Sequence, residues 1–259
     1  MSESIYLQFE LFSVEVCKAD NTELLSGFIA QHNSNVVGEI ESASLLLQAK
    51  HDGLHLQWNK DGEKPLNFYI DVIKVVNQLR SYPASKQGAF NQALGKKSQH
   101  IIDATGGWGG DALLMCTQGY QVTLLERNPV MALMLKDAMT RLSQTEWAID
   151  NDVVTPKVVL ADSVIYFSNN EINESVDCVY LDPMFPPKKK KKAAVNKQMQ
   201  LLQWMVGQDL DASSLVENAL AAGAPRIAVK RPDYAEPLYR KPSNQFSSKL
   251  VHYDVYLQS

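Results

Sequence analysis

The chain reads Ile101-Ile102-Asp103-Ala104-Thr105-Gly106-Gly107-Trp108-Gly109-Gly110-Asp111 where a short apolar run gives way to an amphipathic one. The apolar run is typical of a buried strand, and the amphipathic run of a helix that ends at Gly119. Glycines between a strand and a helix let the backbone approach a ligand closely and aim the helix N-terminus at it. The stretch therefore predicts a strand, a ligand-binding turn that includes Gly107 and Gly109, and a helix.

A carboxylate stands at the end of the next apolar run, in Leu124-Leu125-Glu126-Arg127. Glu126 follows Gly109 by seventeen residues, which places it at the tip of the neighbouring strand. A carboxylate there can accept hydrogen bonds from both hydroxyls of a ribose, so the pair predicts a nucleoside cofactor. The spacing Gly107-x-Gly109-x-x-Ala112 also satisfies the dinucleotide fingerprint, and NAD stays open at this point.

Short apolar runs alternate with longer amphipathic ones from residue 101 onward, which predicts an α/β fold with a Rossmann-like, mostly parallel sheet. The expected strands are 100–104, 120–126, 156–161, 176–182 and 225–230. The expected helices are 111–118, one with Asn128 as N-cap and Pro129 as first residue, a short one after Asp162, and 211–222. The alternating stretch 250–257 predicts an edge strand in a hairpin.

The first hundred residues follow a different pattern. Two alternating runs flank His51-Asp52-Gly53, which predicts a hairpin with glycine in the turn. Helix-like runs follow at 72–79 and 90–94. We therefore expect a small α+β appendage over residues 1–95 and the main domain over residues 96–259.

Length and composition are those of an ordinary globular enzyme: 259 residues, 45% hydrophobic and 21% charged. No apolar run approaches the roughly 20 residues of a membrane span, and the first residues lack the pattern of a secretory signal. Three cysteines without a Cys-x-x-Cys pair and five histidines without ligand spacing predict neither a disulfide framework nor a metal site. The expected location is a reducing cytoplasm.

Charge is sorted along the chain although the net charge is only −4. Residues 103–182 carry 12 acidic and 4 basic side chains, whereas residues 183–259 carry 12 basic and 6 acidic ones. A cationic segment after an acidic one can attract phosphate through its local field. A solvated charged loop at 188–192 is the alternative explanation.

The strand expected at 176–182 ends in Asp182-Pro183-Met184-Phe185-Pro186-Pro187. Its carboxyl end is where open α/β sheets bind ligands. Methylation of an exocyclic base amine needs acceptors that orient the amine and an aromatic face on which the flipped base stacks. Asp182 and the Pro183 carbonyl are the expected acceptors, and Phe185 is the expected platform.

This segment resembles the Asn/Asp-Pro-Pro-Tyr/Phe motif of amino-methyltransferases, with Met184 in the third place. Together with Lys197-Gln198-Met199-Gln200 and Val229-Lys230-Arg231-Pro232-Asp233-Tyr234-Ala235, it is similar to the ribosomal RNA small subunit methyltransferase J family. The resemblance covers roughly residues 80–257. It implies a class I methyltransferase fold and transfer of a methyl group from S-adenosylmethionine to N2 of a guanosine in 16S ribosomal RNA.

The resemblance also implies site residues. Together with the glycine turn, the expected cofactor contacts are Asp103, Gly107, Gly109, Gly110, Asp111, Glu126, Arg127, Asp162, Ser163 and Asp182. In class I methyltransferases the acid after strand three, here Asp162, faces the adenine, which favours S-adenosylmethionine over NAD. The family usually has Arg where this chain has Gly110, so only the backbone amide can serve the cofactor there.

Basic side chains are expected to contact RNA phosphates without reading the base sequence. These residues are Lys188, Lys189, Lys190, Lys191, Lys192, Lys230 and Arg231. Two alternatives remain at this stage: an amino-methyltransferase of DNA or of protein glutamine, and a non-catalytic RNA-binding module on the same fold. The expected partner is 16S ribosomal RNA or the small ribosomal subunit.

Overall fold

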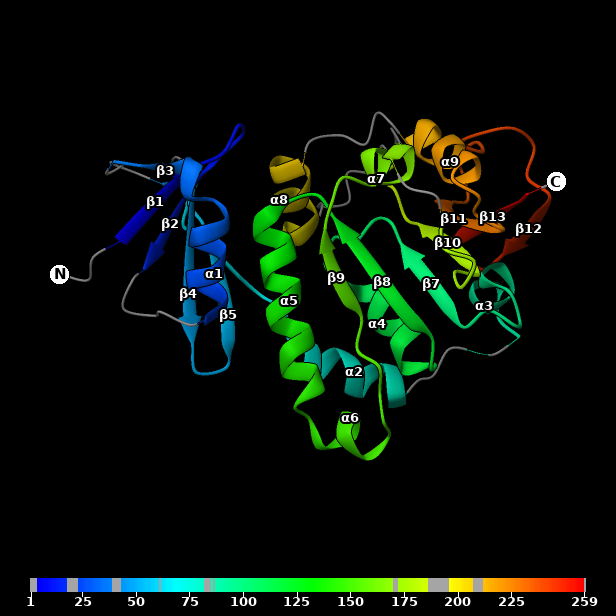
Figure 1. The fold of residues 1–259 in the computed structure, drawn as a ribbon, viewed down its shortest axis with the longest axis horizontal. Coiled ribbons are helices and arrows are strands. Elements are labelled where there is room, and N and C mark those ends of the chain that lie inside the picture. The colour runs from blue at the N-terminus through cyan, green and yellow to red at the C-terminus, as the bar shows by residue number, and fades with distance from the viewer. Residues whose placement is uncertain are drawn as a thin grey trace.

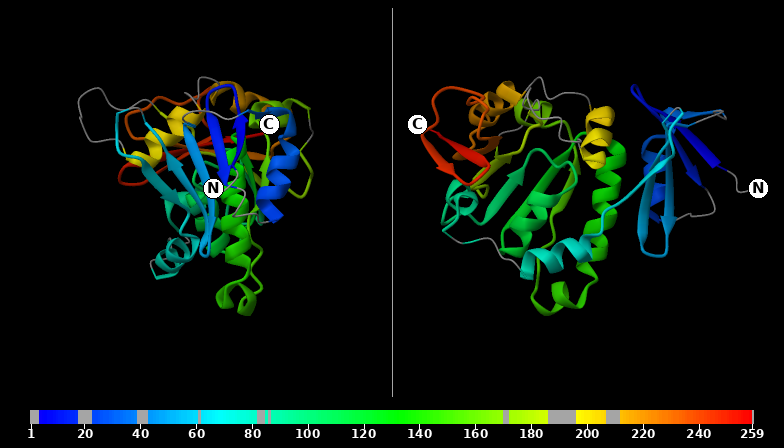
Figure 2. Two further views of the ribbon diagram at one scale, coloured as in Figure 1. Left: turned by 90° about the vertical axis from the view of Figure 1, so that its left-hand side faces the viewer. Right: turned by 180° about the vertical axis from the view of Figure 1, so that it is seen from behind.

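In the computed structural model of Figure 1, the described residues form two β-sheets, with helix α5 (Pro129–Ser143) between them. The described residues are 4–17, 23–38, 43–60, 62–81, 85, 87–169, 172–185, 196–206 and 212–258. The N-terminal sheet stands at one end of the molecule and the C-terminal hairpin at the other (Figure 2). In the described ranges, no helix has the length and apolar character to cross a membrane.

In the described part of residues 4–69, six strands form the N-terminal sheet in the order β3-β1-β2-β4-β5-β6. They are β1 Ser4–Gln8, β2 Ser13–Cys17, β3 Val36–Val37, β4 Leu45–Lys50, β5 Gly53–Trp58 and β6 Leu66–Tyr69, accompanied by helix α1 Glu23–Gln31 and a 3-10 turn at Asn33–Asn35. Side chains alternate between the faces of a strand, so the β4–β5 hairpin buries Leu45, Leu47, Leu54 and Leu56 on one face. The predicted hairpin is therefore present.

Seven strands from the described ranges between residues 100 and 257 form the second sheet in the order β12-β13-β11-β10-β7-β8-β9. They are β7 His100–Asp103, β8 Gln121–Glu126, β9 Lys157–Leu160, β10 Cys178–Leu181, β11 Arg226–Pro232, β12 Asn244–Ser247 and β13 Val251–Leu257. Strands β7 to β11 run parallel, as predicted. The order reverses between β7 and β10, so the ligand crevice of an open α/β sheet is expected at their carboxyl ends.

One strand prediction is corrected by the topology. The late alternating stretch does form a hairpin, but β13 pairs antiparallel with both β11 and β12 and is not at the edge. Its burial follows from this position, because Tyr253, Asp254, Val255 and Tyr256 are all buried. The strand at this edge of the sheet is the shorter and more polar β12.

Helices cover both faces of the second sheet. They are α2 Val72–Ser81, α3 Ala89–Leu94, α4 Gly110–Thr117, α5, α6 Glu146–Asp150, α7 Ser163–Asn169, α8 Lys197–Val206 and α9 Ala212–Ala221. Asn128 caps α5 as predicted, because its side-chain oxygen accepts from the backbone N–H groups of Val130 and Met131. The sequence did not predict α6 and α8.

Successive residues of the central strands supply two separate cores. Ile101, Leu124 and Tyr180 pack with α4, α5 and the N-terminal sheet, whereas Ile102 and Leu125 pack with α7 and α9. A strand buried on both faces is apolar at consecutive positions, which is the pattern read from the sequence. This two-sided burial fixes the strand ends that carry the polar side chains of the site.

The N-terminal sheet shares one continuous hydrophobic core with α5, α4 and the second sheet. Helices α2 and α3 fall within the predicted 1–95 domain, but they contact α4, α5 and strands of the second sheet. The division of the chain into domains at 1–95 and 96–259 stays a prediction.

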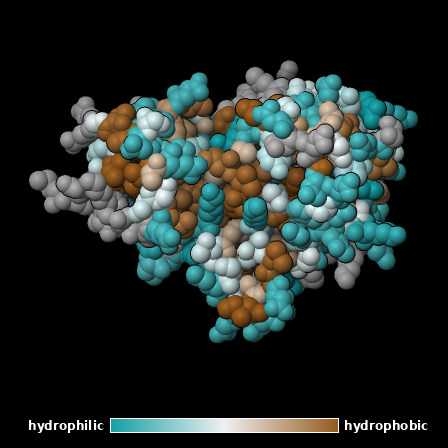
Figure 3. Space-filling view, in the orientation of Figure 1, coloured by the Kyte–Doolittle hydropathy of each residue, from teal (hydrophilic) through white to brown (hydrophobic). Residues whose placement is uncertain are grey.

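On the face drawn in Figure 3, apolar surface lies between the N-terminal sheet with its helix α1 and helix α5. Leu24, Phe28 and Leu133 line a groove there.

A polar latch fastens the β4–β5 hairpin to α5. The Arg141 guanidinium donates to Asp137 Oδ2 at 2.9 Å, to the Tyr69 hydroxyl at 2.9 Å and to the Ile70 carbonyl at 2.9 Å. Asp137 Oδ2 also accepts from the backbone N–H of Leu54 at 3.1 Å. Every member is largely shielded, so loss of the guanidinium would leave acceptors without donors.

Arg141→Ala should therefore lower the free energy of unfolding by about 2–3 kcal/mol, because hydrogen bonds to a charged group are lost at a shielded site. Urea unfolding measures the loss. Arg80→Ala is the matched control, since that exposed guanidinium lies over the Trp147 ring at 4.8 Å and should cost less than about 1 kcal/mol. Equal losses in the two variants would contradict a stabilising latch.

Candidate active site at the carboxyl ends of the central strands

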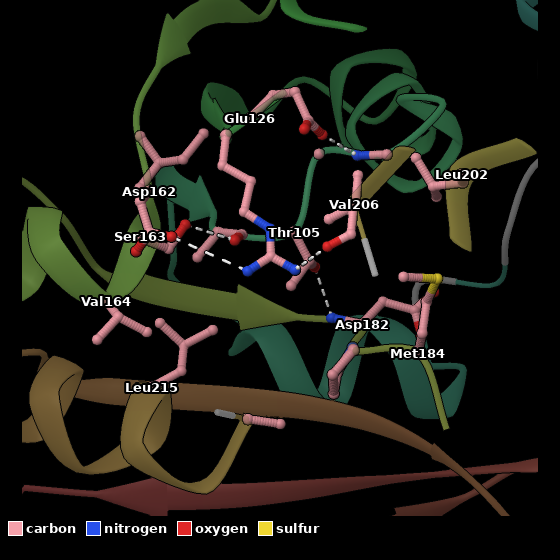
Figure 4. Close-up of a pocket in the computed structure, with 17 residues that line it drawn as sticks. Thr105, Glu126, Asp162, Ser163, Val164, Asp182, Met184, Leu202, Val206 and Leu215 are labelled. Atoms are coloured by element: carbon pink, nitrogen blue, oxygen red, sulfur yellow. Dashed lines mark hydrogen bonds and ion pairs between the residues drawn. The ribbon is translucent and has the colours of Figure 1, made fainter. Parts of the chain in front are cut away.

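A pocket opens at the carboxyl ends of β7, β8, β9 and β10, where the sheet order reverses (Figure 4). Seven of the residues singled out from the sequence line it: Gly107, Glu126, Arg127, Asp162, Ser163, Asp182 and Pro183. They come from four separate turns that are far apart in the chain. The parallel register of the strands brings these turns together, as the sequence pattern predicted.

The turn after β7 approaches the pocket with its backbone. A Cβ added at Gly106 would lie 2.6 Å from Leu124 Cδ2 and 2.8 Å from the Leu125 carbonyl oxygen, so no side chain fits there. Gly107 has φ +51°, in the left-handed region that favours glycine. Gly106 was not among the predicted contacts, although it lines the pocket. Its only signal was membership in the glycine run.

Glu126 is a buried carboxylate that ties the glycine turn to the next helix. Its Oε2 accepts from the backbone N–H of Gly107 at 2.8 Å, and its Oε1 accepts from the N–H of Asn128 at 2.7 Å. Both bonds hold the carboxylate at the tip of β8, facing the pocket (Figure 4). Each carboxylate oxygen has a second lone pair, so Glu126 can still accept from a ligand hydroxyl.

Arg127 and Asp162 form the side of the pocket near β9. Arg127 Nη1 lies 3.9 Å from Asp162 Oδ2, and Nη2 donates to the Val206 carbonyl at 3.3 Å. Asp162 also accepts from the Ile165 N–H and so caps α7. Ser163 donates its hydroxyl to the Ala104 carbonyl at 2.6 Å, which joins the start of α7 to the turn after β7.

The opposite walls of the pocket are apolar. The side chains are Leu125 from β8, Val164 from α7, Leu202 and Val206 from α8, and Leu215 from α9. The contribution of α8 was not predicted from the sequence, because that helix follows a lysine-rich stretch and its first residues are polar. The available signal was the apolar set Leu201, Leu202 and Met205, which helical spacing places on one side.

Helix α8 is supported by the N-terminal sheet. The Trp204 ring packs against Trp58 at a centroid distance of 5.2 Å and against Phe12 at 6.1 Å. Trp108, from the glycine turn, stacks on Phe68 at 5.7 Å, and its Nε1 donates to the Gln198 carbonyl. The N-terminal sheet therefore contacts both the turn and the helix that line the pocket.

The turn after β7 holds the backbone of Asp182 in place. The Asp182 N–H donates to Thr105 Oγ1 at 2.7 Å, and the Thr105 hydroxyl and N–H both donate to Asp103 Oδ1. Asp103 is buried, and burial raises its pKa to about 7 despite these hydrogen bonds. Asp103 therefore acts on the pocket through Thr105 and does not line it.

The Asp182 carboxylate pairs with Lys230, whose Nζ lies 2.8 Å from Oδ2. Burial raises the pKa of Asp182 to about 6, the Lys230 ammonium opposes that rise, and the nearby Asp111 carboxylate adds to it. Pro183 is buried beside it, and Met184 completes this side of the pocket. Phe185 is half-buried and lies just outside the pocket lining.

Several predicted contacts do not line the pocket. Gly109 has φ +76° and precedes α4, and Gly110 is exposed at the first residue of that helix with open space at its Cβ. The Asp111 carboxylate accepts from Tyr180 and Lys230 instead of facing the pocket. These three residues therefore shape the helix start that follows the turn.

The predicted RNA contacts at Lys230 and Arg231 are corrected. Arg231 is 6% exposed, and its guanidinium is bonded to Asp254 and to the Ala235 carbonyl inside the protein. Lys230 is already neutralised by Asp111 and Asp182. Neither cation is presented to a polyanion, so we withdraw both. The run Lys188 to Lys192 lies outside the described residues.

The donor set fits S-adenosylmethionine. The turn presents backbone to the pocket at Gly107, where an added Cβ would meet Leu202 Cδ2 at 3.4 Å, and the Glu126 carboxylate lies beside it as a ribose acceptor. The apolar walls suit a flat adenine, with the Asp162 carboxylate at their edge. Within the described part of the chain, no three His, Cys, Asp or Glu side chains are placed to hold a metal ion.

Comparison with known proteins gives a consistent result. The family model described as "Putative SAM-dependent methyltransferase" matches residues 31–258. The ribosomal RNA small subunit methyltransferase J of Shewanella sediminis is 36% identical over 77% of this chain and 78% of its own length. The protein of the same name from Pasteurella multocida is 35% identical over 93% of this chain and 97% of its own length.

A solved structure supports the fold. The crystal structure of a SAM-dependent methyltransferase from Neisseria gonorrhoeae superimposes with a TM-score of 0.67 and covers 95% of both chains. Its sequence is 24% identical to this one. The parallel sheet with its antiparallel β13 is the sheet of a class I methyltransferase.

Proposed function

Because the chain belongs to the ribosomal RNA small subunit methyltransferase J family of SAM-dependent methyltransferases, we propose that it methylates the exocyclic N2 of one specific guanosine in 16S ribosomal RNA. The methyl donor of this class of enzyme is S-adenosylmethionine (SAM). The observation that supports an amine as acceptor is the Asp182-Pro183 segment, which lines the pocket at the end of β10. Because the family consists of SAM-dependent methyltransferases, SAM and not NAD is the cofactor.

SAM, when bound, supplies a methyl group on a sulfonium centre, which already activates it for displacement. The residues that would hold it are Gly106 and Gly107 by their backbone, Glu126 at the ribose, and Asp162 beside the adenine. The remaining task of the protein is to hold the acceptor nitrogen in line with the methyl group at near-attack distance.

The Asp182 carboxylate and the Pro183 carbonyl are suited to this task. A guanine amine has two N–H donors, and two acceptors fixed by the backbone orient the nitrogen lone pair. The Asp182 N–H is anchored on Thr105, so the carboxylate leaves the strand in one direction. A negative carboxylate also stabilises the positive charge that develops on the nitrogen during transfer.

A base inside an RNA helix cannot reach this pocket, so the guanine must be unpaired or flipped out. Phe185, half-buried beside the pocket, is the proposed stacking platform. Stacking of a base on an aromatic ring contributes about 1–3 kcal/mol and tolerates any base. Selection of a base that carries an exocyclic amine therefore depends on the acceptors that face the amine.

Lys188 to Lys192 follow this segment directly in the chain and are the proposed phosphate contacts. Replacing all five lysines by serine should weaken RNA binding and reduce the slope of log affinity against log salt by up to about 4, because each lost phosphate contact removes about 0.7–0.9. SAM affinity should not change. Fluorescence anisotropy at a series of salt concentrations measures the slope.

The control for the lysine run is Lys157→Ser. Lys157 is exposed at the amino end of β9, whereas the pocket lies at the carboxyl ends of the strands. That variant should bind RNA like the wild type at every salt concentration. If the variant with all five lysines replaced has the same salt slope as the wild type, Lys188 to Lys192 do not contact RNA phosphates.

The substrate is tested by transfer of labelled methyl from SAM to small ribosomal subunits taken from cells that lack this protein. We expect label in 16S ribosomal RNA, and none in subunits that already carry the modification. Naked 16S ribosomal RNA, double-stranded DNA and total protein are assayed in parallel. Label in DNA or protein alone, or SAM binding without transfer, would contradict the proposal. Action on the ribosome also implies a cytoplasmic location.

A further inference from the structure

Lys230 and Asp111 join Asp182 in a charged cluster beside the pocket. Lys230 Nζ lies 2.7 Å from Asp111 Oδ2 and 2.8 Å from Asp182 Oδ2. The side chains of Lys230, Asp111 and Asp182 are 24%, 25% and 38% exposed. Neither Lys230 nor Asp111 lines the pocket. The ammonium is therefore available to the carboxylate that faces the substrate, and not to the substrate itself.

The fold builds this cluster from three elements. Strand β11 pairs in parallel with β10 so that Val229 lies opposite Leu181. The next residues, Lys230 and Asp182, therefore leave neighbouring strands side by side. Asp111 comes from the first turn of α4, directly after the glycine turn. Tyr180, a fully buried residue of β10, donates its hydroxyl to Asp111 Oδ2 at 2.6 Å and so fixes the Asp111 carboxylate.

The cluster contains more acids than bases. Asp103, Asp111 and Asp182 act on one another, and among the residues that the structure describes Lys230 is the cation that acts on Asp182. Burial works to lower the pKa of Lys230, but the Asp182 and Asp111 carboxylates outweigh it and hold that pKa above its ordinary value. The other titratable neighbours are Tyr180 on β10 and Tyr253 on β13, and burial raises the pKa of both phenols. The ammonium therefore stays charged throughout the physiological range.

We propose that Lys230 is a positioning residue for methyl transfer: its ammonium orients the Asp182 carboxylate and keeps it ionised against the neighbouring acids. This inference rests on the proposed function, because it gives Asp182 the part of acceptor for the substrate amine. Without the ammonium, the Asp182 carboxylate would lie near the Asp111 carboxylate with no cation of the described residues beside it. Asp182 would then take up a proton at a higher pH, because a neighbouring like charge disfavours its ionised form.

Replacement of Lys230 and replacement of Asp111 should shift the pKa of Asp182 in opposite directions. With Lys230 in place, Asp182 loses its negative charge as the pH falls through about 6. In Lys230→Met the attraction is gone, so the carboxyl protonates at a pH higher by about 1–3 pH units. In Asp111→Asn a repelling charge is gone, so Asp182 stays ionised to lower pH. Lys230→Arg keeps the cation and should titrate like the wild type.

Two measurements on the full-length protein test the inference. The first is the pH titration of the Asp182 carboxyl by carbon-13 NMR in aspartate-labelled protein, assigned with Asp182→Asn. The second is the single-turnover rate of methyl transfer to unmodified small subunits between pH 5.5 and 9 at saturating SAM. The Lys230→Met rate should fall about tenfold at pH 7, and the deficit should shrink toward pH 9. Folding is checked by circular dichroism, and SAM binding by calorimetry.

The possible results of these two measurements distinguish failure of the role proposed for Lys230 from failure of the proposed function. Opposite shifts in the Lys230→Met and Asp111→Asn titrations, with matching shifts of the acidic limb of the rate, support the inference. A Lys230→Met rate lowered equally at every pH, or an unmoved Asp182 titration, would overturn it and leave the methyltransferase proposal standing. If the wild type transfers no methyl to small-subunit RNA at any pH, both fail together.

Discussion

Asp182→Ala should lower the rate of methyl transfer by at least about 100-fold while SAM binding and the fold survive. The side chain removed is the carboxylate that faces the pocket and that we propose as the acceptor for the guanine amine. Loss of one fixed electrostatic contact at a reacting group costs two to three orders of magnitude in comparable sites. The backbone of the segment should keep its place, because the Asp182 N–H bond to Thr105 does not need the side chain.

Single-turnover kinetics with unmodified small subunits measure this loss, and calorimetry measures SAM affinity. Asp182→Asn should retain part of the rate, because an amide oxygen still accepts a hydrogen bond although the charge is gone. Asp150→Ala is the control, since that carboxylate is exposed at the end of α6. Full activity in Asp182→Ala would remove Asp182 from the reaction.

Gly106→Ala should disable the cofactor site. The new Cβ would lie 2.6 Å from Leu124 Cδ2, 2.8 Å from the Leu125 carbonyl oxygen and 3.2 Å from Glu126 Cβ. The carbonyl belongs to the central strand β8 and cannot move aside cheaply, so the turn itself must shift. Overpacking of this kind costs about 1–3 kcal/mol of stability. SAM affinity should fall by at least about tenfold, because the turn that holds the cofactor is displaced.

Gly27→Ala is the matched control for this substitution. Gly27 lies within α1, and a Cβ there would meet nothing within 4 Å. That variant should bind SAM like the wild type and unfold at the same or a slightly higher urea concentration, because alanine favours a helix over glycine. Calorimetric titration with SAM distinguishes the two variants. Equal affinities would show that the close approach at Gly106 is not needed for the cofactor.

Much of the fold could be predicted because the central strands of the second sheet are buried on both faces. These strands are short apolar runs, and β7, β8 and β10 run into the acidic residues Asp103, Glu126 and Asp182, which mark the turns. Glu126, Asp162 and Asp182 were found in this way, since the carboxyl ends of parallel strands meet at one edge. The comparisons then confirmed the family that the Asp-Pro-Met-Phe-Pro segment had indicated.

The rest depended on contacts between segments far apart in the chain. Lys230 and Arg231 are adjacent cations in the sequence, yet the first pairs with Asp111 and Asp182 and the second with Asp254. Their partners come from α4, from the end of β10 and from β13, and no local pattern reveals such pairing. The interior position of β13 was missed for the same reason, because strand order is a property of tertiary packing.

The identity of the modified nucleoside shows directly whether this protein methylates N2 of guanosine. Small subunits from cells lacking the protein are treated with the purified enzyme and SAM, the 16S ribosomal RNA is digested to nucleosides, and the products are separated by liquid chromatography with mass spectrometry. We expect one new N2-methylguanosine per subunit, absent with Asp182→Ala. A methyl group on a ring nitrogen, on a ribose or on another base would contradict it.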